Sequence, residues 1–106
     1  MTHSNYTTRV DTLFTEIEDA IDAANLSIET ESESGMLSLI FSDDSQAIFS
    51  RQPSLGELWF AANNQGYHFK WENDRWIDTR EGDDLNHVLN TVLTNKLGHT
   101  INLTLT

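Results

Sequence analysis

The sequence predicts an α+β fold, a two-layer α/β sandwich in which two helices pack on one face of a twisted antiparallel sheet. Three observations indicate it: a long segment of helical periodicity near the start, a series of short alternating segments separated by turn residues, and a second helical segment near the end. A helix, roughly five to seven strands and a helix, in that order, favour two layers. The 106 residues, 1–106, suit one domain with a single core.

The first helix is predicted to begin near Ser4 or Asn5, either of which is a good N-cap, and to run to about Ala24, where Asn25 can end it. At about a hundred degrees of rotation per residue, its apolar side chains fall on one stripe. This stripe, which we expect in the core, consists of Tyr6, Val10, Leu13, Ile17, Ile21 and Ala24, with Phe14 at its edge.

The next segment, 26–33, alternates with the period of two that a strand requires, and Ser34-Gly35 is typical of a hairpin turn. Residues 36–41 form a second strand, with Leu37, Leu39 and Phe41 pointing inward. Further strands are predicted at 46–51, 58–61, 67–71 and 75–79, separated by turn residues at 42–45, 63–66 and 72–74 and by Pro53. These strands read as an antiparallel meander.

The second helix follows Gly82, with Asp83 as the predicted N-cap and Asp84 in the first turn. Its expected core stripe consists of Leu85, Val88, Leu89 and Val92. Lys96 and Gly98 are C-terminal signals. The tail, 100–105, alternates again, which predicts either a short edge strand or a cover for the core.

The formal net charge of -11, with only six Lys and Arg, argues against nucleic acid as a partner, because phosphate neutralisation needs clustered basic residues. Cations and basic protein surfaces are the natural partners, although acidity can also serve solubility alone. Without cysteine, the chain has no disulfide or thiolate metal site of its own. Neither a signal peptide nor an apolar run of membrane-spanning length is present, so we expect a cytoplasmic protein.

No catalytic motif is found, and we therefore expect no enzyme. The four histidines, His3, His68, His87 and His99, lack metal-ligand spacing and are interpreted as surface residues. His3 is considered as an accessory ligand only because it precedes the acidic part of the first helix.

Carboxylates are concentrated in the first helix and the first strand. We call this set the acidic ridge: Asp11, Glu18, Asp19, Asp22, Glu29, Glu31 and Glu33. Asp11 and Asp22 are roughly 16 Å apart along a helix and cannot share one ion. Glu18 and Asp19 each lie one turn from Asp22, about 5 to 6 Å between Cβ atoms, and either pair can bracket a hydrated cation. The strand acids repeat about every 6.8 Å.

Oxygen ligands favour hard cations such as Fe²⁺, Fe³⁺, Mn²⁺, Mg²⁺ and Ca²⁺, bound weakly and with little discrimination. Crowded carboxylates also repel one another, so cations should stabilise the protein. The alternatives are that the helix acids are a solvated face and that the strand acids protect a sheet edge from unwanted pairing.

Trp59 is the second candidate site. Strand alternation places Leu58 and Phe60 on one face and Trp59 on the other, with Glu57 and Ala61, where Trp is a common binding anchor. The alternative is that Trp59 packs under a loop or the tail. His68 and Lys70 should face water.

The order of elements and several segments resemble the frataxin family, bacterial frataxins in particular. The segments are the acidic first helix, Arg51-Gln52-Pro53, Leu58-Trp59-Phe60-Ala61, Gly66-Tyr67-His68-Phe69 and Trp76-Ile77-Asp78. The resemblance implies an iron-binding protein of iron-sulfur cluster assembly, an iron donor or sensor that modulates the cysteine desulfurase and contacts the scaffold protein. It also implies iron (Fe²⁺/Fe³⁺) that is weakly and exchangeably bound, no membrane partner, and a monomer that iron can drive to oligomers.

Carried onto this chain, the resemblance implies metal binding at Asp11, Glu18, Asp19, Asp22, Glu29, Glu31 and Glu33, and partner binding at Glu18, Asp19, Asp22 and Trp59. Ala23-Ala24-Asn25 stands where close relatives have further acids, which predicts fewer or weaker ridge sites. Two alternatives stay open. One is a weak ferroxidase or iron-storage protein, which normally needs carboxylates and His converging inside a bundle. The other is a purely protein-binding regulator of the desulfurase with incidental metal binding.

Overall fold

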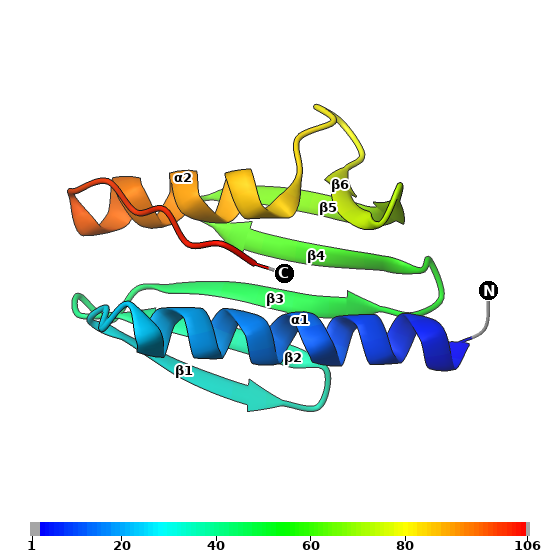
Figure 1. Ribbon diagram of the computed structural model, residues 1–106, viewed down its shortest axis with the longest axis horizontal. Coiled ribbons are helices and arrows are strands. Elements are labelled where there is room, and N and C mark those ends of the chain that lie inside the picture. Colours follow the sequence, from blue (N-terminus) through cyan, green and yellow to red (C-terminus); the bar gives the residue numbers. More distant parts are fainter. Residues whose placement is uncertain (1–2, 106) are drawn as a thin grey trace.

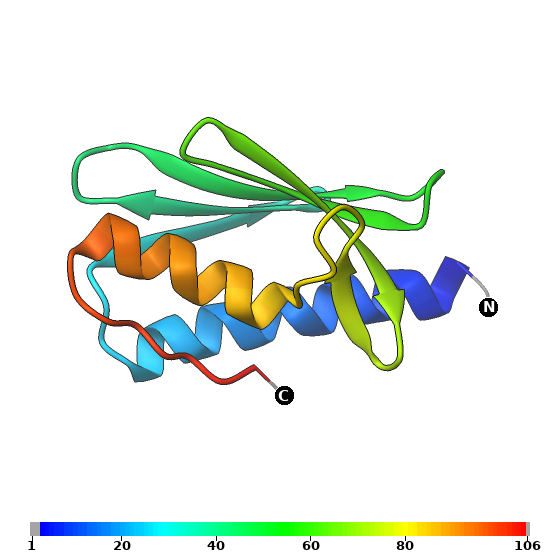
Figure 2. The same cartoon turned by 90° about the horizontal axis from the view of Figure 1, so that it is seen from above.

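The computed structural model describes residues 3–105, in which two helices lie on one face of a six-stranded sheet (Figures 1 and 2). The elements follow in the order α1 (His3–Ala23), β1 (Ile28–Glu33), β2 (Met36–Phe41), β3 (Gln46–Gln52), β4 (Glu57–Ala62), β5 (Gln65–Glu72), β6 (Arg75–Asp78) and α2 (Leu85–Leu97). The strands are neighbours in sequence order and every pair is antiparallel. The predicted α+β two-layer sandwich is confirmed.

Three of the hairpins close through two residues that both have positive φ, at Ser34-Gly35, Asn63-Asn64 and Asn73-Asp74. Type I′ turns require this conformation, and their twist matches the twist of the flanking strands. The turns predicted at 63–66 and 72–74 are therefore shorter than expected. Because two residues suffice, Gln65, Gly66 and Glu72 belong to the strands.

The core lies between the sheet and the helices. Phe49 of β3 and Phe60 of β4 stack at its centre with ring centroids 4.0 Å apart, and both are almost fully buried. The predicted α1 stripe is buried with one exception. Ala24 is exposed, because α1 ends at Ala23 and Asn25 turns the chain away in a left-handed conformation. At its other end, α1 already includes His3, so Ser4 and Asn5 lie inside the helix and the predicted start was late by one or two residues.

The N-cap of α2 is Asp84, which corrects the prediction of Asp83. The Asp84 carboxylate accepts a hydrogen bond from the backbone N–H of His87 at 2.9 Å. Asp83 stays outside the helix, because its backbone carbonyl accepts a hydrogen bond from the N–H of Asp78 at the end of β6. At the other end of α2, Gly98 adopts the left-handed conformation that closes the helix.

The tail covers the core and adds no strand within the described residues. It runs back along α2 on the side away from the sheet (Figure 2) and buries Ile101 and Leu103. The Asn90 side chain accepts from the N–H of Leu103 and donates to its carbonyl, at 2.8 and 2.9 Å. Of the two predicted roles, the cover for the core is therefore the one observed, and side chains of α2 satisfy the tail backbone in place of a neighbouring strand.

Neither helix of the described part is long and apolar enough to cross a membrane.

Candidate metal and partner-binding site

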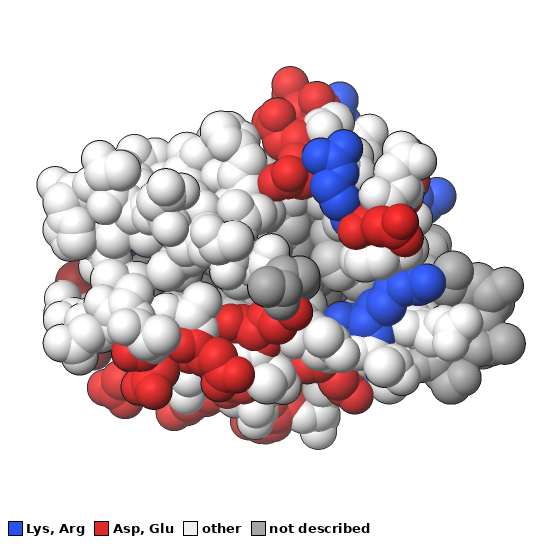
Figure 3. All heavy atoms as spheres, viewed as in Figure 1, with Lys and Arg blue, Asp and Glu red and all other residues white. Residues whose placement is uncertain are grey.

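The acidic ridge follows α1 and the neighbouring edge strand β1. Figure 3 shows acidic side chains gathered along this side of the molecule. Among the helix acids, Asp11, Asp19 and Asp22 are exposed and Glu18 is half-buried; all three strand acids are exposed. The predicted alternation is therefore correct: the acids of both elements point away from the core.

The ridge consists of two surfaces that meet at one point. Alternation along β1 turns Ile28 and Thr30 toward α1, so Glu29, Glu31 and Glu33 stand on the opposite, open side of the sheet. Only near the β1–β2 turn do acids from both elements approach each other. There Asp11, Glu18 and Glu33 line a shallow depression of about 290 Å³. Asp19, Asp22, Glu29 and Glu31 lie outside it.

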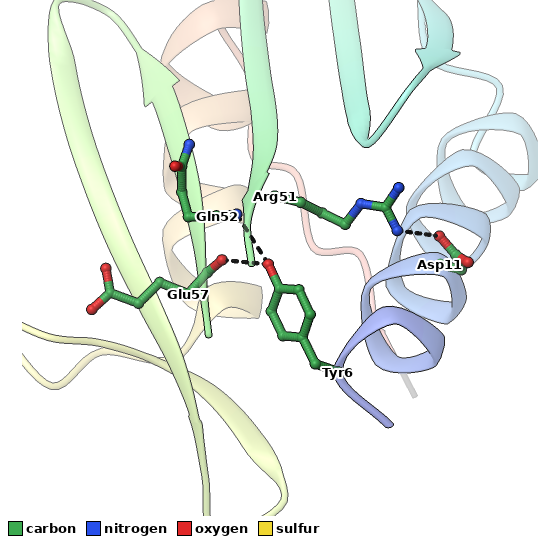
Figure 4. A network of polar contacts seen from close by, with 5 residues as sticks. All are labelled: Tyr6, Asp11, Arg51, Gln52 and Glu57. Atoms are coloured by element: carbon green, nitrogen blue, oxygen red, sulfur yellow. Dashed lines mark hydrogen bonds and ion pairs between the residues drawn. The ribbon is translucent and has the colours of Figure 1, made fainter. Parts of the chain in front are cut away.

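Asp11 has a counter-ion that sequence analysis missed. The Arg51 guanidinium, from the end of β3, reaches across Gly35 and places Nη1 3.5 Å from Asp11 Oδ1 (Figure 4). Forty residues separate the two, so helical spacing gives no sign of the pair. The available signal was strand alternation, because Arg51 shares the inward face with Ala47 and Phe49.

Tyr6 anchors the beginning of α1 to the sheet beside this pair (Figure 4). Its hydroxyl donates to the Glu57 carbonyl at 2.6 Å and accepts from the Gln52 N–H at 3.0 Å. Burial raises the pKa of the Tyr6 phenol, so the donor stays protonated at neutral pH. Both bonds hold α1 at a defined distance from β3 and β4, which positions the acids of the helix.

The carboxyl-terminal part of α1 concentrates negative charge. Asp22 lies in the last turn, within a turn of Glu18 and Asp19, and that turn has no basic residue. The unpaired carbonyl groups at a helix C-terminus carry partial negative charge and favour cations there. Like charges one turn apart also destabilise a helix. A cation at this end of α1 relieves both effects.

The donor set fits an exchangeable, hydrated hard cation. The predicted donors of the acidic ridge are all carboxylate oxygens, the type that Fe²⁺, Mn²⁺ or Mg²⁺ accepts beside retained water. Among residues 3–105, no group of three or more His, Cys, Asp or Glu is arranged to hold a metal ion. Nor do the described histidines converge, and the side chain of His3 lies outside the described part of the structure. The geometry suits paired carboxylates and not a closed cage.

Trp59 lies on the open sheet face, opposite both helices and the tail, as alternation predicted. It is half-buried because its indole stacks on His68, with ring centroids 4.2 Å apart and planes within 9°. The indole Nε1 also donates to Glu57 Oε1 at 2.9 Å. His68 and Lys70 are exposed as expected. Of the alternative, packing under a loop or the tail, the tail is excluded because it lies on the other side of the sheet; the printed contacts of the indole are with His68 and Glu57.

Fold and site together define a class: a small acidic α+β sandwich with an open antiparallel sheet and a carboxylate surface along its first helix. The model of the family described as a frataxin-like domain matches residues 1–99, and the chain therefore belongs to the frataxin-like family. The predicted resemblance is confirmed.

Two bacterial relatives are both called iron-sulfur cluster assembly protein CyaY. The protein of Paraburkholderia phymatum is 33% identical over 97% of this chain and 98% of its own length. That of Tolumonas auensis is 36% identical over 82% and 84%. Among solved structures, frataxin from Psychromonas ingrahamii superposes with a TM-score of 0.92 at 27% identity, over 98% of this chain and 99% of that one.

A more distant structure is trimeric frataxin from Saccharomyces cerevisiae, complexed with ferrous iron. It has a TM-score of 0.71 at 19% identity and covers 92% of this chain and 89% of its own. At this identity the likeness supports the fold alone.

Proposed function

We propose that this protein serves iron-sulfur cluster assembly, binding iron exchangeably on the acidic ridge and modulating the cysteine desulfurase through the same surface. The family and the names of the two bacterial relatives support the pathway. Iron is the cargo that we infer from membership of the frataxin-like family, of which a yeast protein has been solved in complex with ferrous iron.

One observation carries the proposal: the carboxylates of α1 are concentrated at the end of the helix where negative charge is least favourable, with no basic residue in the last turn. Such an arrangement lowers the stability of the free protein. It becomes favourable when a cation or a basic protein surface covers it, which is the behaviour required of a carrier that must also release its cargo.

Iron would be held here by Glu18 with Asp22 or by Asp19 with Asp22, with water completing the coordination. Oxygen-only ligands and retained water favour fast exchange. Because Asp19 and Asp22 are exposed and Glu18 is half-buried, a protein partner with clustered Lys and Arg can compete with iron for the same oxygens. Glu29, Glu31 and Glu33 extend this negative field along the free edge of the sheet, where they also discourage pairing with another strand.

Trp59 provides a second contact surface, which we assign to the scaffold protein. A half-buried indole on an uncovered sheet face, held by His68 and Glu57, loses little conformational freedom when a partner covers it. The helix acids Glu18, Asp19 and Asp22 lie on α1, on the other side of the sheet from Trp59, and the strand acids that share its open face lie on β1, three strands away from β4. Binding of cation and of scaffold should therefore be separable by mutation.

A purely protein-binding regulator is the second candidate. The observation in its favour is the open, divided arrangement of carboxylates, which suits a basic protein surface as well as it suits a cation. The same dispersion speaks against a ferroxidase centre, which needs converging ligands. The cytoplasmic location and the monomeric state stay predictions.

The test is cluster assembly on the scaffold by the desulfurase, measured over a range of Fe²⁺ concentrations with and without this protein. The ridge variant is Glu18→Gln/Asp19→Asn/Asp22→Asn. Its control, Glu72→Gln/Asp74→Asn/Glu81→Gln, removes the same charge from exposed positions outside the ridge. The proposal predicts that the ridge variant loses the effect on assembly rate while the control keeps it, and that high salt reduces the wild-type effect. Equal effects of both variants would contradict it.

A further inference from the structure

Arg51 is the one basic residue that the described ion pairs place on the acidic ridge. Its partner Asp11 has a side chain 66% exposed, whereas the Arg51 side chain is only 25% exposed. The guanidinium is therefore held by its surroundings and the carboxylate remains open to solvent. A cation that approaches Asp11 must therefore compete with the Arg51 guanidinium for the same carboxylate.

The backbone and side chain of Arg51 both engage the β1–β2 turn. Its N–H donates to the Gly35 carbonyl at 2.9 Å. The side chain then passes so close to Gly35 that a Cβ there would stand 2.7 Å from Arg51 Nε. Gly35, with φ of +83°, thus leaves the space through which the guanidinium reaches Asp11. This turn also carries Glu33, so one side chain connects β3, the turn and α1.

The pair lies at the depression where the two surfaces of the ridge meet. Asp11 lines it together with Glu18 and Glu33, which makes it the place where acids of helix and strand share one solvent space. We propose that Arg51 is a built-in counter-ion of the acidic ridge, which a divalent cation must displace from Asp11 in order to bind between α1 and the β1–β2 turn. This inference rests on the proposed function and adds the residue that limits affinity at one end of the ridge.

Two consequences follow. Cation binding is weaker at the depression than the number of carboxylates suggests, because an internal cation already neutralises one of them. Displacing the guanidinium also moves it away from Gly35. Cation binding at Asp11 should therefore change the amide signals of the β1–β2 turn, which follows Glu33. Asp19 and Asp22 lie outside this pair and should bind cations independently of Arg51.

The test compares Arg51→Gln with Arg75→Gln by Mn²⁺ titration, following paramagnetic broadening of backbone amide signals. Arg75 is a matched control, because it also pairs with an aspartate, Asp84, at 3.4 Å and its replacement changes the net charge equally. Loss of a competing surface ion pair predicts that Arg51→Gln lowers the Mn²⁺ concentration for half-broadening at Asp11 and Glu33 by about two- to five-fold. Arg75→Gln should leave it within error of the wild type.

Equal midpoints for the two variants would overturn the role of Arg51 while leaving cation binding intact. If wild-type amides at 18–22 and 29–33 showed no broadening, the proposed cation site itself would fail. Should Arg51→Gln not fold, the Arg51 Nε–H signal of the wild type decides the question in a Mg²⁺ titration. A counter-ion predicts that this signal shifts with the same midpoint as the Asp11 amide, with Arg75 unchanged; an unmoved Arg51 signal would refute it.

Discussion

Replacing Asp22 with Asn should stabilise the fold and weaken cation binding at the same time. Asp22 lies one turn from Glu18 and one turn from Asp19, and each like-charge pair costs about 0.2–0.5 kcal/mol. A negative charge in the last turn of a helix costs about 0.3–1 kcal/mol more at low ionic strength. No described ion pair offsets these costs for Asp22. The substitution should therefore raise the free energy of unfolding by about 1 kcal/mol.

Thermal unfolding measures this gain directly. For a domain of this size about 1 kcal/mol corresponds to roughly 4–8 °C in Tm. The increase should be largest at low ionic strength and mostly disappear near 1 M salt, where the Debye length falls to about 3 Å. Asp22→Glu is the control, because it keeps the charge and should leave Tm within about 2 °C of the wild type.

Adding Mn²⁺ completes the experiment. Wild-type Tm should rise with Mn²⁺ because the ion relieves the same repulsion, and Asp22→Asn should show a clearly smaller rise. A Tm that is unchanged or lower in Asp22→Asn at low salt would refute the electrostatic reasoning. So would a stabilisation that persists unchanged at high salt, since it would then have another cause.

Four further predictions follow from individual contacts. Asp84→Ala removes the N-cap of α2 and the Arg75 ion pair, and should lower the unfolding free energy by about 1 kcal/mol in urea denaturation. Asn90→Ala leaves both backbone groups of Leu103 without their partner and should cost about 1–3 kcal/mol, with faster amide exchange at 101–105. The Lys96 ammonium, with the Ser45 hydroxyl and N–H, holds the pKa of Asp43 well below its usual range. The pair therefore stabilises the fold above pH 3.8 and loses this contribution as the pH falls further. Lys96→Met should lower the free energy of unfolding at neutral pH and lower it progressively less in acid. Trp59→Ala should weaken scaffold binding in calorimetry and spare the Mn²⁺ midpoint; loss of both would contradict two separate surfaces.

Much of the fold was predictable because each element buries one side. The helical stripe from Tyr6 to Ile21 and the alternation of Leu37 with Leu39 have different periods, and only one arrangement of layers buries both. Ala24 was misplaced because the apolar pattern continues one residue beyond Ala23, where the helix ends. Asp83 and Asp84 have equal capping propensity, and the choice depends on a β6 hydrogen bond that local sequence does not contain.

The candidate site was predictable only in part, for a related reason. Spacing within one helix or strand identifies which acids share a side, as it did for Glu18 with Asp22 and for Glu29 with Glu31. It carries no information on what another element brings to that side. Arg51 reaches Asp11 from a strand that the chain enters after two hairpins, and the depression at Glu33 exists only because α1 packs beside the β1–β2 turn. Tertiary packing determines both features.

The central claim is that α1 and β1 hold carboxylates that accept a ferrous ion exchangeably. It is tested most directly by anaerobic titration of the protein with Fe²⁺, monitored through the backbone amide signals of the described residues. The account predicts that signals at 18–22 broaden first, that those at 29–33 follow, and that a chelator restores all of them. Broadening centred on His68 and Trp59, or none anywhere along α1 and β1, would contradict it.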